Sequence, residues 1–86
     1  MKVGDIVISI CGHDMGEWYI IKSVQNEFVY LIDGKNKPIE KPKRKKIKHI
    51  AQANYFAESI AQKLLNGKYI QNAEVRKAIK FFKNNI

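Results

Sequence analysis

Short runs of apolar and β-branched residues, separated by turn-forming residues, fill the first fifty positions of the chain. Residues 6–10 read Ile-Val-Ile-Ser-Ile, an alternation that is typical of a β-strand. The runs at 18–24 and 28–32 are rich in aromatic and β-branched residues, which favour strands. Residues 35–41 and 47–50 can add a fourth and a fifth strand. Five short strands of this kind predict a mainly β fold, a small antiparallel barrel.

The residues between these runs are typical of tight turns. Gln25-Asn26 forms a short turn, and Asp33-Gly34 is a strong hairpin signal. Pro38 lacks a backbone N–H, so the predicted fourth strand is expected at an edge or a bulge of the sheet.

The second predicted strand is apolar on both faces. Trp18, Ile20 and Val24 lie on one face, and Tyr19 and Ile21 lie on the other. One set can fill the barrel, whereas the other set needs a cover, because an exposed apolar patch of that size is a liability. The second half of the chain is the expected cover.

The second half carries the 3.6-residue repeat of two amphipathic helices. The first ends at Asn66-Gly67, and the second begins with Asn72 as its N-cap and Glu74 in its first turn. We therefore predict a barrel over residues 1–50 and a two-helix C-terminal extension over residues 51–86. The apolar stripe of the first helix comprises Ala53, Phe56, Ala57, Ile60, Ala61, Leu64 and Leu65. The stripe of the second comprises Val75, Ala78, Ile79 and Phe82, and its cations are Arg76, Lys77, Lys80 and Lys83.

Positive charge is concentrated in the middle and the C-terminal third of the chain. The 86 residues carry a net charge of +8, with −3 in residues 1–34, +7 in residues 35–49 and +4 in residues 50–86. Such an uneven distribution is expected of a binding surface for a polyanion.

The highest density of positive charge lies in the basic run Lys41–Lys48, which has six cations in eight positions. Neutralising phosphates with such side chains releases condensed counterions, which drives nucleic-acid binding. A solvated loop and a nuclear localisation signal are the alternative interpretations of the same residues. The predicted phosphate contacts are Lys41, Lys43, Arg44, Lys45, Lys46 and Lys48, with help from Lys35 and Lys37 and, as secondary contacts, from the cations of the second helix.

Three segments together resemble a known family. Val3–Val7, the loop Gly12-His13-Asp14-Met15-Gly16 and the segment Glu40–Ile50 are similar to the KOW motif of small bacterial proteins that resemble archaeal and eukaryotic large-subunit ribosomal proteins. The resemblance implies an SH3-like barrel and binding to RNA, most plausibly ribosomal RNA, with ribosomal proteins as further partners. The chain has Met15 where many KOW loops have Lys, and Tyr19 where many have a further Gly.

The KOW loop has two interpretations that are compatible with each other. Gly12, His13, Asp14 and Gly16 can form a structural hairpin loop, or the same loop can also present backbone amides to RNA. Trp18, Tyr19, Phe28 and Tyr30 are expected to be packing residues, with Tyr19 and Tyr30 as weak candidates for stacking on bases.

The sequence favours a binding protein over an enzyme. Cys11 and His13 would need further metal ligands, and only His49 is available beyond carboxylates, so no metal site or other cofactor is expected. No set of nucleophile, base and acid is visible. The alternative function is a protein-interaction module of the transcription or translation machinery. A single cysteine and the absence of a long apolar run predict a cytoplasmic protein without a membrane span.

Overall fold

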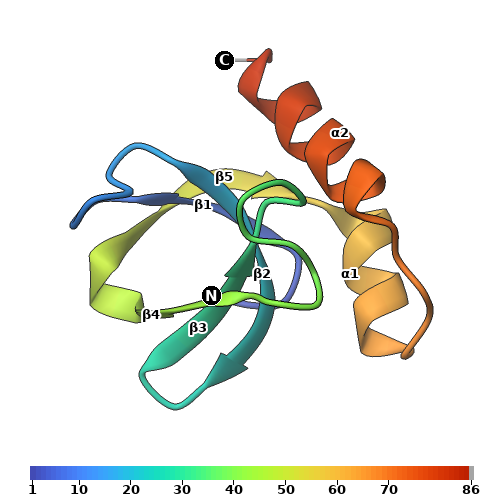
Figure 1. Cartoon of the computed structure of the whole chain (residues 1–86), viewed down its shortest axis with the longest axis horizontal. Helices are drawn as coiled ribbons and strands as arrows, with labels where there is room; N and C mark the ends of the chain where they lie inside the picture. The colour runs from blue at the N-terminus through green and yellow to red at the C-terminus, as the bar shows by residue number, and fades with distance from the viewer. Residues whose placement is uncertain (86) are drawn as a thin grey trace.

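The computed structural model describes residues 1–85 as one five-stranded antiparallel sheet and two helices (Figure 1). The strands are β1 (Asp5–Ser9), β2 (Trp18–Gln25), β3 (Phe28–Ile32), β4 (Lys43–Lys46) and β5 (Ile50–Phe56). A 3₁₀ turn, η1 (Ile47–His49), links the last two strands, and the helices are α1 (Glu58–Leu65) and α2 (Asn72–Lys83). The predicted mainly β fold with two C-terminal helices is confirmed.

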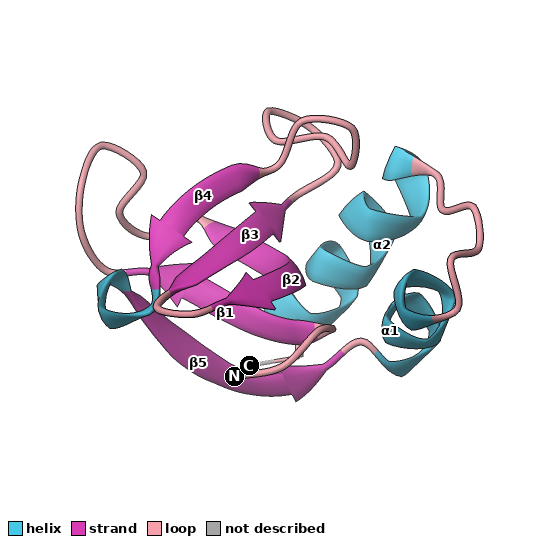
Figure 2. Ribbon diagram, turned by 90° about the horizontal axis from the view of Figure 1, so that it is seen from below, coloured by secondary structure: helices cyan, strands magenta, loops and turns pink. Residues whose placement is uncertain are grey.

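The strands are ordered β4-β3-β2-β1-β5, so consecutive strands pair except at β5, which returns to β1. The sheet is curved and open, with β4 and β5 as its two edges (Figure 2). Both views place the helices on the side of the sheet away from β4.

Two apolar clusters occupy opposite faces of this sheet, as the two-faced pattern of the second strand predicted. The inner cluster contains Val7, Tyr19, Ile21, Val29, Leu31 and Ile50. The outer cluster joins Ile6, Ile20 and Ile32 of the strands to Ile60, Ile70, Val75 and Ile79 of the helical half. The helices therefore supply the expected cover, and burial of these side chains is the main stabilising contribution.

The predicted fourth strand, residues 35–41, is wrong. This segment is part of a loop, because the Asp33 carboxylate accepts hydrogen bonds from the backbone N–H groups of Lys35 and Lys37, both at 2.8 Å. Gly34 follows with a positive φ of 74°. The side chain of Asp33 thus closes a wider turn than a two-residue hairpin, and the fourth strand begins only at Lys43.

The boundary between the sheet and the helices also differs from the prediction. The predicted fifth strand, residues 47–50, is mostly the turn η1, and β5 continues to Phe56, into the segment predicted as the start of the first helix. The N-cap of α2 is Gln71 and not Asn72, and the Glu74 side chain accepts a hydrogen bond from the Gln71 N–H at 3.3 Å. The predicted end of α1 at Asn66-Gly67 is confirmed, with Gly67 at a φ of 65°.

Helix α2 holds the loop that leads into β4. The Asn72 side chain accepts a hydrogen bond from the N–H of Ile39 at 2.9 Å and donates to the Glu40 carboxylate at 3.1 Å. Arg76 donates to the carbonyl oxygen of Gly34 at 2.6 Å. The helical half therefore fixes the entry of the chain into its most basic segment.

Candidate nucleic-acid interface

The basic run forms an edge strand of the sheet. Residues Lys43–Lys46 make up β4, which pairs with β3 through Leu31↔Lys43, Tyr30↔Arg44, Val29↔Lys45 and Phe28↔Lys46. Lysine, which makes up three of the four residues of β4, has a low intrinsic preference for strands, so tertiary pairing with β3 determines this conformation.

Strand geometry divides the cations of β4 between the two faces of the sheet. Lys43 and Lys45 lie opposite Leu31 and Val29, two members of the inner cluster. The alternate residues Arg44 and Lys46 therefore point to the outer face and are exposed. Lys41 and Lys48, which flank the strand, are also exposed. We call Lys41, Arg44, Lys46 and Lys48 the outward cations.

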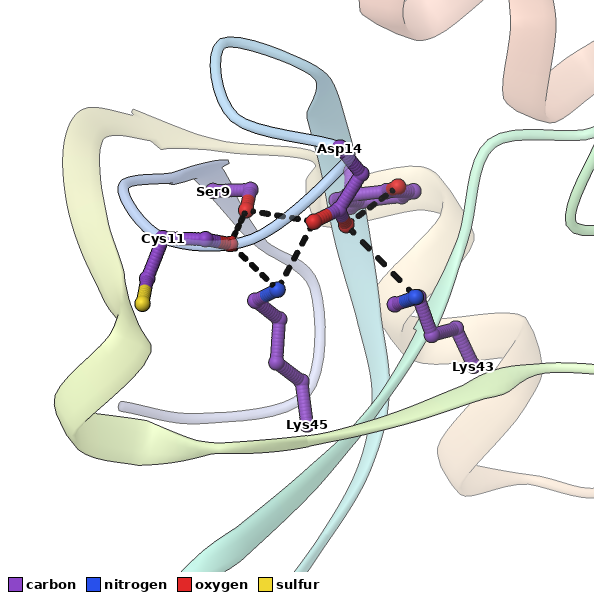
Figure 3. Close-up of polar contacts among 6 residues, drawn as sticks. Ser9, Cys11, Asp14, Lys43 and Lys45 are labelled. Carbon is purple, nitrogen blue, oxygen red and sulfur yellow. Dashed lines mark hydrogen bonds and ion pairs between the residues drawn. The ribbon is translucent and has the colours of Figure 1, made fainter.

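The two inward lysines converge on Asp14 in the loop 12–16 (Figure 3). The Lys45 ammonium lies 2.8 Å from Asp14 Oδ1 and also donates to the carbonyl oxygen of Cys11 at 2.8 Å. Lys43 is 3.9 Å from Asp14 Oδ2. The Lys45 side chain is only 9% exposed, whereas that of Lys43 is 33% exposed. Lys45 is therefore occupied within the chain, and Lys43 is partly accessible.

Two hydroxyl groups complete the surroundings of Asp14. Ser9 donates to Oδ1 at 2.9 Å, and Tyr19 donates to Oδ2 at 2.8 Å. Burial alone would raise the pKa of the Asp14 carboxyl, but the hydrogen bonds from Lys45, Tyr19 and Ser9 outweigh it and hold the pKa well below its usual range. Burial and the bond to Asp14 raise the pKa of Tyr19, so this hydroxyl stays protonated and keeps donating.

The loop 12–16 has a well-defined internal structure. Gly12 and Gly16 both have positive φ, at 90° and 91°, a conformation that glycine adopts without steric cost. The N–H of Gly16 donates to the Ser9 carbonyl oxygen at 2.8 Å, and Asp14 fastens the loop to β4. His13 is exposed at the rim of a groove that also includes Asp14, Lys37 and Lys43. The loop thus has a structural role, and Gly12, His13 and Gly16 remain accessible.

The remaining cations predicted for the site lie elsewhere. Lys35, Arg76, Lys80 and Lys83 line a separate groove beside α2, together with Trp18 and two acidic residues, Glu17 and Asp33. Lys77 is exposed on the same helix. These residues are therefore not continuous with the outward cations of β4, and Figure 1 shows β4 and α2 on opposite sides of the molecule.

The structure changes which aromatic residues are accessible for stacking. Tyr19 is 2% exposed and bonded to Asp14, so it does not offer a surface for stacking. Tyr30 is partly exposed on the outer face of β3, next to Arg44. The missed residue is Phe28, whose ring lies 4.1 Å from the guanidinium carbon of Arg44. Its signal was the alternation 28, 30, 32, which places Phe28 and Tyr30 on one face of the strand.

Comparisons with known proteins add no assignment. The chain matches no protein-family model, and no curated protein is significantly similar to it. Within residues 1–85, no group of three or more His, Cys, Asp or Glu side chains could hold a metal ion, and no helix has the length and apolarity needed to cross a membrane.

Proposed function

We propose that this protein binds structured RNA, with ribosomal RNA as the expected class, through the outward cations of β4 and its flanks. The observation that carries the proposal is the separation of the basic run into two faces. Asp14 pairs closely with Lys45 and, at 3.9 Å, with Lys43, whereas Lys41, Arg44, Lys46 and Lys48 are exposed. A row of cations on a rigid strand can follow the phosphates of a nucleic-acid backbone. The proposed action is binding alone, without catalysis.

Protection of the sheet edge is the competing explanation for these lysines. Natural proteins often place lysine on an edge strand to prevent pairing with another chain. That role needs one or two charges. It does not account for cations that continue before and after β4, at Lys41 and Lys48, or for an arginine that lies over a partly exposed aromatic ring.

We also propose that the sheet belongs to the SH3-like class and that the loop 12–16 corresponds to a KOW loop. The strand order, with β5 returning to β1 after a 3₁₀ turn, supports this proposal. An apolar cluster on the inner face, separate from the cluster under the helices, supports it as well.

A matched pair of single substitutions tests the proposed function. Lys46→Gln removes an outward cation, and Lys68→Gln removes an equally exposed lysine from the α1–α2 connection, on the far side of the molecule (Figure 1). We expect Lys46→Gln to weaken binding to a structured RNA and to flatten the salt dependence of log K by about 0.7–0.9. Lys68→Gln should bind like the unmodified protein. Equal behaviour of the two variants would exclude β4 from the site.

A protein partner is the second candidate, and two exposed apolar side chains at the proposed KOW loop favour it. Ile10 and Met15 are 50% and 67% exposed, and they lie at the two ends of this loop. Co-purification of a protein that survives nuclease treatment would support this function, whereas loss of the partner after nuclease treatment would favour RNA.

A further inference from the structure

The outer face of β3 and β4 has a part that the helices do not cover. Phe28, Tyr30 and Ile32 point to this face, but only Ile32 belongs to the cluster under the helices. On the neighbouring strand β2, Ser23 and Gln25 pair with Tyr30 and Phe28 and are exposed. Two aromatic rings therefore lie in an open, polar part of the surface, next to the outward cations.

Within this surface Arg44 stacks on Phe28. Its guanidinium carbon lies 4.1 Å from the centre of the ring, and Arg44 as a whole is exposed. A guanidinium group is planar, so contact with one ring leaves its second face free for another flat group. The ring also restricts the orientations of Arg44 before any ligand arrives, which lowers the entropic cost of binding.

We propose that Arg44 and Phe28 form a stacking platform for one unpaired base of the bound RNA. This inference rests on the proposed RNA binding and adds the kind of RNA that is recognised. Tyr30 lies directly opposite Arg44 and offers a second ring edge, with its hydroxyl 3.4 Å from the Gln25 side-chain oxygen. Lys46 and Lys48 line a shallow groove beside the platform together with Glu27 and Ile47, and the two lysines can pair with the adjoining phosphates.

The platform selects among RNA structures. A base in a continuous duplex is stacked on its neighbours and cannot lie on a protein side chain, whereas bases of loops, bulges and single strands can be splayed out. The ligand of this site is therefore an RNA with at least one unpaired base beside a structured stem. An acidic protein surface would satisfy the cations but would leave the free face of Arg44 without a flat partner.

The test compares two RNA probes on two proteins. One probe is a hairpin with an adenine-rich loop, and the other is a blunt duplex with the same number of phosphates. Arg44→Lys keeps the charge and removes the planar group, so it separates stacking from electrostatic attraction. We expect Arg44→Lys to lower the ratio of hairpin to duplex affinity by about 5- to 100-fold, which is the range that base stacking supplies.

A second variant guards against an effect that is particular to lysine. Phe28→Leu keeps an apolar side chain but removes the ring that supports Arg44, and it should lower the same ratio. Thermal unfolding checks that each variant is folded. An unchanged ratio in the folded Arg44→Lys protein would overturn the platform while leaving electrostatic RNA binding intact. Failure of the unmodified protein to bind either probe at low salt would instead overturn the proposed function.

Discussion

Lys45 and Asp14 lie thirty-one positions apart in the chain and form an ion pair of 2.8 Å between Nζ and Oδ1. The pair joins the loop after β1 to the edge strand β4, and Ser9 and Tyr19 donate to the same carboxylate. An acidic residue in the least basic part of the chain thus organises the most basic part. The paired and hydrogen-bonded charge is expected to stabilise the fold and to fix which faces of β4 remain free.

Removal of this carboxylate charge should destabilise the protein. Asp14→Asn leaves the Lys45 ammonium, which is largely buried, without its counter-ion, and we expect a loss of about 1.5–3 kcal/mol in the free energy of unfolding. Urea denaturation measures this loss. Glu17→Gln is the matched control, because Glu17 is an exposed carboxylate at the end of the same loop. Equal stability of both variants would show that the Asp14 network contributes little.

The contribution of Asp14 should depend on pH in the acid range. Its pKa is lowered in the folded protein, so the stabilisation is fully present above the ordinary carboxyl pKa of about 4 and is lost as the pH falls further. The difference in unfolding free energy between the unmodified protein and Asp14→Asn should therefore be constant from pH 5 to 7 and shrink below about pH 4. A difference that grows on acidification would contradict this linkage.

Close packing of α2 against the loop after β3 predicts an unequal response of two glycines. Gly34 and Gly67 both have positive φ, at 74° and 65°. A Cβ atom at Gly34 would collide with the backbone oxygen of Asn72, whereas a Cβ atom at Gly67 would meet open space. Gly67→Ala should cost about 1–2 kcal/mol from backbone strain alone. Gly34→Ala should cost clearly more, and similar midpoints in thermal unfolding would argue against the docking of α2 on this loop.

Several elements could be predicted because local pattern and tertiary structure agree there. The aromatic and β-branched run 28–32 gives the bounds of β3, and Asn66-Gly67 marks the end of α1. Residues 18–21 are apolar on both faces of the strand, which predicted a second apolar layer, and the helices supply this layer. In each case the residues favour the conformation that packing also requires.

Other elements depend on contacts that a linear pattern does not reveal. Residues 53–57 fit both a helical and an alternating repeat, and short apolar runs leave this choice open. Pairing of β5 with β1 selects the strand, with Asn54 at a positive φ near an irregularity in the register. The ion pair to Asp14 could not be read from the sequence either, because its partners meet only when the sheet has formed.

The division of the basic run makes the two faces of β4 separable by mutation. Lys45→Gln should lower stability, because it removes the main partner of Asp14, yet it should leave the salt dependence of RNA binding nearly unchanged. Lys46→Gln should flatten the salt dependence of RNA binding and leave the stability nearly unchanged. Titrations at several salt concentrations, combined with urea unfolding of both variants, check this pairing of effects. If Lys45→Gln flattened the salt dependence as much as Lys46→Gln, the division of β4 into a paired inward face and a free outward face would be contradicted.

The central claim is that the exposed charges of β4 and its flanks attach this protein to RNA. The most direct measurement is the affinity of the unmodified protein for a structured RNA between about 50 and 300 mM salt, plotted as log K against log salt concentration. Four outward cations predict a straight line with a slope of about −3. A slope near zero, or no detectable binding at the lowest salt concentration, would contradict the claim.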